Sequence, residues 1–403
     1  MIYEEVETCY KILPEFGKQR LLTYAESLEE LSFHYISFLD KGENSSREEQ
    51  ICGEKIMENR RVISGQLKEI SHMLKNLANE AYYTTRSLEK HKKKICKILK
   101  ENGLDLKEMY AVANQNGYLE IGMILNAIKE GDLFEASDIG DFLSKMLHNQ
   151  MSAVPGMPAY IGDEETKLIF REEVRFYMTT GVARATKEGE ISSGDNFTMT
   201  ELMDGTFLAV ISDGMGCGDA ANQDSNMVIE LTEQLMEAGF KMEAVANMMN
   251  DLILVKTQEP RTATLDLFKC NLYSGECKFL KMGAAPTFLR IGKGIEVKME
   301  YSLPLGLFPK DSSPKEEELE ECFLNPGDFV VMLSDGVIDS IEKSGGMKEE
   351  KRPYQFFSKL LKEYDFVSCK DLANQILGMA IMSVEGRVPD DMTVLVMQMQ
   401  ERW

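Results

Sequence analysis

Residues 196–216 read NFTMTELMDGTFLAVISDGMG, and this stretch decides the class of fold. Two runs rich in β-forming residues, 196–203 and 206–212, flank the dipeptide Asp204-Gly205. An Asp-Gly pair between two such runs is typical of a tight β-hairpin, because it accepts the positive φ angles of the turn. The second run ends at Asp213-Gly214, so a carboxylate follows the end of a strand. The stretch therefore predicts antiparallel strands.

Runs of strands and pairs of helices continue on both sides of this hairpin. Helical periodicity predicts helices at 220–237, 242–255, 354–363 and 370–384. Further strands are predicted at 168–185, 262–271, 277–282, 287–291, 295–299, 328–333 and 393–399. Strands in runs and helices in pairs favour an α+β sandwich of two antiparallel sheets flanked by helices over an alternating βαβ fold.

The region before residue 160 has a different pattern, dominated by one helical stripe. Apolar residues spaced three and four apart fall at Ile56, Ile63, Leu67, Ile70, Leu74 and Leu77. This amphipathic stripe predicts a long helix over about 46–101. A stripe of this kind packs against a second helix, which belongs either to the same chain or to a second copy in a homodimer.

A small α+β element and a linker are predicted after this helix. The element consists of strands at 109–112 and 118–124, the turn pair Asn116-Gly117 between them, and a helix at 138–147. The segment MSAVPGMP at 151–158 contains two prolines, which discourage both helix and sheet. We therefore predict a linker there, between one domain at 1–155 and another at 160–403.

The composition excludes nucleic acid as a partner and indicates a reducing compartment. The net charge is -22 and the pI about 4.8, so a nucleic-acid backbone would be repelled, and no basic stripe offsets this. The eight cysteines include no C-x-x-C pair, which favours reduced cytosolic thiols over a zinc site or a disulfide framework. The sequence shows no signal peptide and no uncharged apolar run near the ~18 residues that span a bilayer. We expect a soluble, cytoplasmic chain.

The histidines limit the chemistry of the larger domain. They are His34, His72, His91 and His148, and all four precede residue 160. A Ser-His-Asp or Cys-His mechanism is therefore excluded within the larger domain, as are most zinc hydrolase arrangements.

The larger domain instead carries aspartates at the ends of predicted strands. They are Asp195, Asp213, Asp335, Asp390 and Asp391, in the motifs SGD, SDGMG, SDG and PDDMT. An Asp-Gly pair alone is ordinary turn chemistry. Strand ends that meet at one edge of a sandwich would bring these carboxylates together, and divalent cations would make that crowding tolerable. Hard oxygen ligands, with the carbonyl of Gly214 available beside Asp213, favour Mn²⁺ or Mg²⁺.

The motifs also resemble those of a known family. In chain order they are SGDN, SDGMGCGD, ATLDL, FLKMGAAPTF, LPLG, SDGV and DDMT. They resemble the metal-dependent PP2C-type phosphatases and, within these, the stage II sporulation protein E family. The resemblance runs over 165–403, and a weaker one continues upstream at 59–69. It implies a PP2C-like α-β-β-α sandwich preceded by a regulatory domain at 1–155 that contains the long helix.

The resemblance assigns a two-metal centre to the acidic motifs. It implies that Asp213 bridges two Mn²⁺ or Mg²⁺ ions, with the Gly214 carbonyl on one of them. Asp335 and Asp390 complete the second ion's ligands. A water between the ions would lose a proton and attack the phosphoserine phosphorus in line.

Three further residues have less settled roles under the resemblance. Asp195 matches the first acidic motif and binds metal directly or through water. Asp391 is either a ligand or a neighbour that orients one. Eukaryotic relatives hold the phosphate with an arginine shortly before the first acidic motif; the nearest candidate is Arg184, and the alternative is a solvated strand residue.

The implied function is a protein serine phosphatase acting on a phosphorylated anti-anti-sigma protein, which activates a sigma factor in sporulation. The family's phosphatase is membrane-anchored, and the resemblance adds cell-division proteins as partners. This chain is cytoplasmic as given; as part of a longer anchored protein it would lie at the cytoplasmic face of the membrane. The long helix would regulate activity by repositioning the helices predicted at 220–255.

Two alternatives remain. A stress-response PP2C-type phosphatase of a partner-switching pathway would share every acidic ligand, and the upstream similarity at 59–69 argues against it. A non-catalytic interaction module on a phosphatase scaffold would be expected to have lost an acidic ligand, and none is missing.

Overall fold

The computed structural model describes residues 21–33, 60–76, 78, 85–113, 118–214, 218–256, 262–299, 303–307, 319–343, 352–364 and 368–402. The chain divides into two compact units, Met1–Glu173 and Val174–Trp403. This division falls after Glu173, whereas the sequence predicted a linker at 151–158 and domains at 1–155 and 160–403. The segment with the prolines begins as strand β4 (Met151–Ala153), which pairs with β6 (Thr166–Glu172), so the chain returns to the first unit before leaving it.

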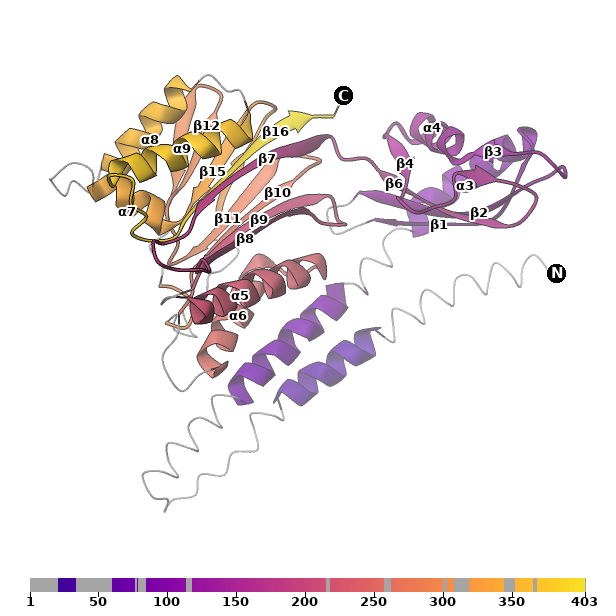
Figure 1. The fold of residues 1–403 in the computed structure, drawn as a ribbon. Coiled ribbons are helices and arrows are strands. Elements are labelled where there is room, and N and C mark those ends of the chain that lie inside the picture. The colour runs from indigo at the N-terminus through magenta and orange to yellow at the C-terminus, as the bar shows by residue number, and fades with distance from the viewer. Residues whose placement is uncertain are drawn as a thin grey trace, which may run out of the picture. The chain divides into compact units, whose positions relative to one another are not determined.

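The second unit contains two five-stranded antiparallel sheets (Figure 1). The first sheet has the order β14-β11-β10-β9-β8, and the second has the order β13-β12-β15-β16-β7. The strands of the first are β8 (Asp195–Glu201), β9 (Thr206–Asp213), β10 (Leu265–Asn271), β11 (Glu276–Met282) and β14 (Glu320–Phe323). Those of the second are β7 (Phe176–Ala185), β12 (Thr287–Ile291), β13 (Gly294–Lys298), β15 (Phe329–Leu333) and β16 (Met392–Glu401).

Helices cover the outer face of each sheet (Figure 1). On the first sheet lie α5 (Asp219–Glu237) and α6 (Met242–Lys256). On the second lie α7 (Asp335–Lys343), α8 (Arg352–Glu363) and α9 (Cys369–Ser383). The predicted α-β-β-α sandwich is confirmed.

The core between the two sheets is apolar and closely packed. Phe268 and Phe279 meet there with ring centroids 5.1 Å apart, and Met397 from the opposite sheet joins the same cluster. A second apolar cluster lies under α7, α8 and α9. Because burial of apolar surface on both faces is the main stabilising contribution, both sheets are fixed in register, and their strand ends are held in place.

The first unit contains a four-stranded antiparallel sheet of order β1-β2-β6-β4, packed against helices. Its elements include α3 (Thr85–Glu101), β1 (Leu104–Ala113), β2 (Leu119–Ala127) and α4 (Ala136–Leu147). A two-stranded sheet pairs β3 (Phe134–Glu135) with β5 (Tyr160–Ile161). The predicted hairpin is the β1–β2 pair, and its turn residues Asn116 and Gly117 lie outside the described residues.

The long helix was predicted over about 46–101, and this range contains two described helices, 60–76 and α3. Residues 46–59, 77 and 79–84 lie outside the described residues. A further helix at 21–33 packs antiparallel on helix 60–76. Buried Ser32 and Ser64 hydrogen bond to each other at 2.8 Å, and Ser71 donates to the Ala25 carbonyl at 2.7 Å. The partner helix left open by the sequence is therefore found within the chain.

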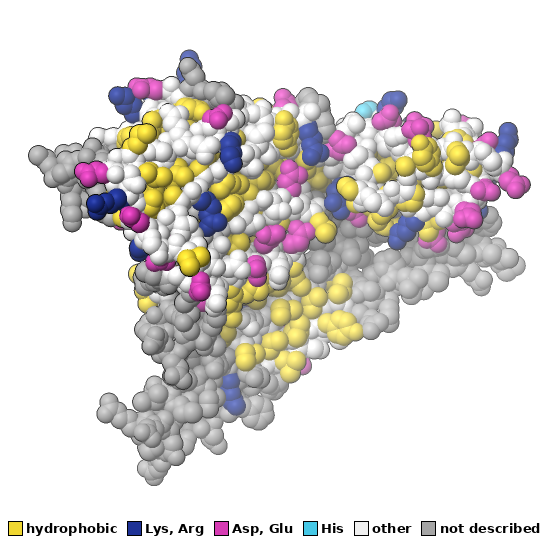
Figure 2. Space-filling view, in the orientation of Figure 1, with side chains coloured by type: hydrophobic (Ala, Val, Ile, Leu, Met, Phe, Trp, Pro, Cys, Tyr) yellow, Lys and Arg dark blue, Asp and Glu magenta, His cyan; other side chains and the backbone are white. Residues whose placement is uncertain are grey.

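The packed face of this pair differs from the predicted apolar stripe. Small side chains make the contact, whereas Ile63 is 38% exposed and Phe33 is 71% exposed. Figure 2 shows hydrophobic side chains on the surface of these two helices. Within the described residues, no helix has the length and hydropathy needed to cross a membrane.

Candidate metal centre

Two of the predicted acidic residues face each other across neighbouring strands. Asp195 is the first residue of β8 and Asp213 is the last residue of β9, and the two are register partners in the antiparallel ladder. The hairpin at Asp204-Gly205 sets this register. A one-residue slip would turn one carboxylate to the opposite face.

The other predicted acidic residues come from the second sheet. Asp335 begins α7 directly after β15, and Asp390 and Asp391 precede β16, which pairs with β15. Gly194 lies between the two sheets' carboxylates: a Cβ there would be 3.3 Å from Asp213 Oδ1 and 3.4 Å from Asp391 Oδ2. Strand ends that are distant in sequence therefore meet at one edge of the sandwich.

Two glycines make this approach sterically feasible. A Cβ on Gly214 would lie 2.1 Å from the carbonyl oxygen of Ala221 on α5. A Cβ on Gly336 would lie 2.0 Å from the carbonyl oxygen of Asp391. Both contacts are with backbone, which cannot move aside, so the residues following Asp213 and Asp335 must be glycine.

The carboxylates at this edge resist ionisation. Burial, followed by the charges of Asp195, Asp335, Asp390 and Asp391, raises the pKa of Asp213 to about 8. Burial also raises the pKa of Asp195 to about 6, against the hydroxyls of Thr393 and Ser334, which favour its charged form. The pKa of Asp335 is raised by burial and then by Asp390 and Asp339. Crowded carboxylates of this kind are characteristic of cation sites.

Asp195 is the strongest indication that this site binds a cation. Its side chain is fully buried, and neither carboxylate oxygen has a hydrogen-bond partner. The nearby hydroxyls of Thr393 and Ser334 influence its pKa but do not lie in hydrogen-bonding geometry. A buried ionisable group without partners is costly. Hard oxygen donors gathered here fit Mn²⁺ or Mg²⁺, although no three acidic, histidine or cysteine side chains among the described residues stand closely enough for one ion.

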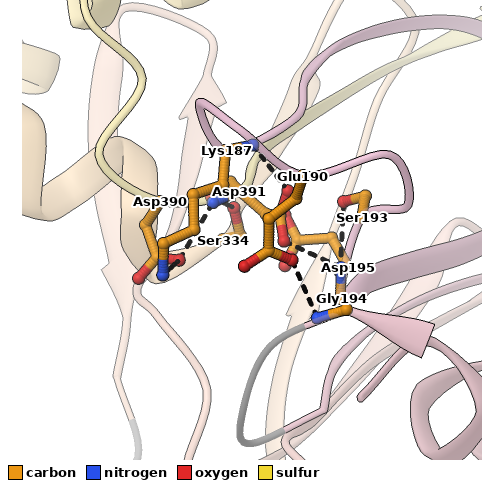
Figure 3. Close-up of polar contacts among 9 residues, drawn as sticks. Lys187, Glu190, Ser193, Gly194, Asp195, Ser334, Asp390 and Asp391 are labelled. Atoms are coloured by element: carbon orange, nitrogen blue, oxygen red, sulfur yellow. Dashed lines mark hydrogen bonds and ion pairs between the residues drawn. The ribbon is translucent and has the colours of Figure 1, made fainter. Parts of the chain in front are cut away.

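Asp391 organises the loop between β7 and β8. Its Oδ1 accepts from the Lys187 backbone N–H at 3.0 Å, and its Oδ2 accepts from the Gly194 N–H at 2.8 Å (Figure 3). Both oxygens are thus engaged by backbone groups. Of the two roles that the sequence left open, this geometry favours orientation of its neighbours.

Two cations border the site. Arg184 lies on β7 opposite Thr393, donates to the Asp195 carbonyl, and places its guanidinium 5.4 Å from the centre of the Phe197 ring. The ammonium of Lys187 lies 3.5 Å from Asp390 Oδ1 (Figure 3). Sequence reasoning missed Lys187, because no motif marks a loop lysine whose position is set by backbone contacts of Asp391.

The same loop also contacts the start of α5. Glu190 accepts from the Gly218 backbone N–H at 2.7 Å, and Ser192 donates to Asp219 Oδ1 at 2.8 Å. Residues 215–217, which connect Gly214 to this point, lie outside the described residues. The β7–β8 loop thus connects the Asp390-Asp391 side of the site with the helix that follows Asp213.

A buried ion pair lies beneath the acidic residues. Lys281 Nζ is 2.5 Å from Asp266 Oδ2 and donates to Thr287 at 2.8 Å, and both charged side chains are only 2% exposed. Asp266 borders a cavity of about 10 Å³ together with Asp213 and Asp335, and its Oδ1 has no hydrogen-bond partner. A cavity of this size holds about one water. Sequence reasoning missed this pair, since it lies inside strands of apolar pattern.

Two family models match the chain. The model described as "Stage II sporulation protein E (SpoIIE)" matches residues 203–400, and the one described as "SpoIIE, regulatory domain" matches residues 32–171. The two matches fall on either side of the structural boundary after Glu173.

Curated relatives and solved structures agree with these matches. Stage II sporulation protein E of Bacillus subtilis is 26% identical over 85% of this chain, and that of Priestia megaterium is 26% identical over 86%. The chain spans 40% and 57% of the lengths of these two relatives. The phosphoserine phosphatase RsbX of Bacillus subtilis is 26% identical over 50% of this chain and 94% of its own length.

The fold is also shared with a solved structure. The PP2C phosphatase domain of SpoIIE from Bacillus subtilis, solved with a fragment of its regulatory domain, superposes with a TM-score of 0.62. That match covers 89% of this chain and all of the other, at 24% identity.

Proposed function

The chain belongs to the stage II sporulation protein E family, with its PP2C fold, and on that premise we propose that it is a metal-dependent protein serine phosphatase. The observation that carries the proposal is the convergence of Asp195, Asp213 and Asp335 at one sandwich edge with raised pKa values. Charge repulsion there costs free energy that bound cations would remove.

The proposed ligands are the predicted ones. Asp213, the Gly214 carbonyl, Asp335 and Asp390 would hold two Mn²⁺ or Mg²⁺ ions. Buried Asp195 would bind directly or through a water. Bound divalent ions supply the charge that lowers the pKa of a nucleophilic water and neutralises phosphoryl oxygens.

The remaining polar groups have positioning roles in this proposal. Asp391 holds both ends of the β7–β8 loop through backbone N–H groups, which fixes the location of Lys187. The Lys187 ammonium lies 3.5 Å from Asp390 Oδ1, and in this proposal it also contacts a phosphate oxygen of the substrate. Arg184 has one donor on the Asp195 carbonyl, and its remaining N–H groups could reach the same phosphate.

We propose a phosphorylated anti-anti-sigma protein as substrate and sigma-factor activation in sporulation as the outcome. The support is the similarity over both units to proteins named for sporulation. The relative RsbX, named a phosphoserine phosphatase, supports a stress-response alternative, but that similarity covers only half of the chain. The match of residues 32–171 to the regulatory-domain model favours the role in sporulation over the stress-response role.

The paired helices 21–33 and 60–76 are the proposed regulatory element. Their contact is satisfied within the chain, while Leu31, Phe33 and Ile63 remain exposed, which leaves an apolar face for a homodimer. Substitutions that introduce a charge at Leu67, Ile70 and Leu74 should change turnover or oligomeric state. If both are unchanged, the helix is only a spacer.

The activity is tested with two substrates. Hydrolysis of p-nitrophenyl phosphate should require Mn²⁺ and should be lost in Asp213→Ala; manganese-independent activity would contradict the mechanism. Phosphate release from the phosphorylated anti-anti-sigma protein of the same organism then tests the substrate. Activity on the small ester without release from that protein would retain the enzyme class and reject the substrate.

A further inference from the structure

Three cysteines form a row across one sheet of the second unit. Cys270 on β10 is the register partner of Cys277 on β11, and Cys277 is in turn the register partner of Cys322 on β14. Register partners in an antiparallel sheet point to the same face. All three side chains accordingly pack in or against the apolar cluster between the sheets. This row is unrelated to the metal centre and to the proposed phosphatase chemistry.

The three thiols differ in their access to solvent. Cys270 and Cys277 are completely buried, whereas Cys322 is part-exposed on β14, the edge strand of its sheet. A reagent from solvent therefore meets Cys322 first. Cys277 lies directly behind it.

The thiols also differ in acidity. The neighbouring Cys277 thiol, followed by the nearby charge of Lys298, lowers the pKa of Cys322 despite partial burial and the opposing charges of Glu296 and Asp328. Lys298 is held close to β14, with its ammonium 3.4 Å from Glu320. Burial raises the pKa of Cys277 well above its usual value. A part-exposed thiol with a lowered pKa next to a buried thiol with a raised pKa is the arrangement of a reactive cysteine and its resolving partner.

We propose that Cys322 is a peroxide-reactive thiol and that Cys277 resolves it into a cross-strand disulfide. Opposed residues in an antiparallel pair have Cα atoms about 4.5 to 5.5 Å apart, within the roughly 4.4 to 6.8 Å range that disulfides span. The bond can therefore form without moving the strands. Cys270 has no exposed surface and remains a thiol.

The chemistry requires one molecule of hydrogen peroxide. The Cys322 thiolate attacks one peroxide oxygen, the O–O bond breaks, and the departing hydroxide takes up a proton to give water. Cys322 becomes a sulfenic acid. The Cys277 sulfur then attacks the Cys322 sulfur, the S–O bond breaks, and the hydroxyl leaves as a second water with the thiol proton. Two thiols are oxidised and one peroxide is reduced.

The test is peptide mapping of the full chain after treatment with hydrogen peroxide. Wild type should yield a Cys277–Cys322 linked peptide that a dithiol reductant separates. Cys277→Ser should stop at a sulfenic acid on Cys322, which dimedone traps. Cys322→Ser should leave Cys277 reduced. Cys96, part-buried on α3, is the internal reference and should oxidise at least about 10-fold more slowly than Cys322.

Two results would overturn the proposal. One is that Cys322 in wild type oxidises no faster than Cys96. The other is that Cys277 is oxidised equally in Cys322→Ser. Cys277→Ala provides a second resolving-cysteine variant, and circular dichroism of each variant confirms that it is folded before the reaction is scored.

Discussion

The two sheets contribute acidic residues to the same edge but place them in opposite environments. On the first sheet, Asp195 and Asp213 are buried, lack compensating cations and have raised pKa values. On the second, Asp335 also has a raised pKa, but the Asp390 side chain is 58% exposed beside Lys187, and each carboxylate oxygen of Asp391 accepts a backbone N–H. The first pair is therefore costly until a cation arrives, whereas Asp390 and Asp391 of the second sheet are stable by themselves. We infer that the first sheet provides the driving force for metal binding and the second provides orientation.

The largest effect should come from the first sheet. Asp213→Asn should lower Mn²⁺-dependent turnover by more than ~100-fold, the upper end for loss of a residue that only supports a ligand. The measurement is p-nitrophenyl phosphate hydrolysis over a Mn²⁺ titration. Asp163→Asn, an exposed change in the other unit, is the control and should behave as wild type. Full activity in Asp213→Asn would contradict the inference that the first sheet drives metal binding.

The same substitution should change how stability depends on pH when metal is chelated. The Asp213 pKa is about 8 in the folded chain and about 3.9 when unfolded, so the folded state holds the extra proton between these values. The stability it contributes is complete below pH ~4 and is lost as pH rises through ~8.

Wild type should therefore lose stability relative to Asp213→Asn over this window, by on the order of a few kcal/mol. Urea midpoints in EDTA at several pH values measure this. Asp163→Asn, in the other unit, is the control, because solvent screens an exposed carboxylate. Equal pH profiles for wild type and Asp213→Asn would remove the proposed difference between the sheets.

Substitutions of Asp391 test whether the second sheet orients the site. Asp391→Ala removes the acceptors for the Lys187 and Gly194 backbone N–H groups and should reduce turnover about 10- to 100-fold. Asp391→Asn keeps one acceptor oxygen and should lose less. An alanine variant with wild-type turnover at every Mn²⁺ concentration would show that the loop needs no such support.

Substitution of Lys187 should have smaller effects, which are opposite for the two ligands: weaker substrate binding and tighter Mn²⁺ binding. Lys187→Met should raise KM for the phosphoprotein about 10-fold, since a hydrogen bond to a charged group contributes ~1.5 kcal/mol or more. It should also tighten Mn²⁺ binding, because the ammonium near Asp390 no longer competes. Lys187→Arg should retain substrate binding, and Lys293→Met in an exposed turn is the charge-matched control. Unchanged KM together with unchanged Mn²⁺ affinity would exclude Lys187 from the site.

Local patterns were sufficient for most of the sandwich. Period-two runs with Asp-Gly or Ser-Gly turns predicted β8, β9, β10 and β11, because turn chemistry and alternation are both encoded locally. The edge strand β14 and helix α7 were missed. β14 is only four residues long, and α7 begins at Asp335, where an Asp-Gly pair suggested a turn.

The acidic side chains could be identified from motifs, but their environments could not. Burial of Asp195 and exposure of Asp390 depend on how the two sheets stack, which is a tertiary property. The division after Glu173 lies beyond the predicted linker for a similar reason, since β6 joins a sheet built from residues far upstream. Lys187 and the Lys281–Asp266 pair depend on contacts between distant segments and leave no local pattern.

Calorimetric titration of Mn²⁺ into the purified chain at pH 7, in buffers of different ionisation enthalpy, measures whether the buried carboxylates bind a cation. Saturable binding with net proton release is expected, because Asp213 holds a proton that a cation must displace. Asp213→Asn should show weaker binding and less proton release. Binding of equal strength in wild type and Asp213→Asn, with no proton released, would contradict a metal centre built on the buried carboxylates of the first sheet.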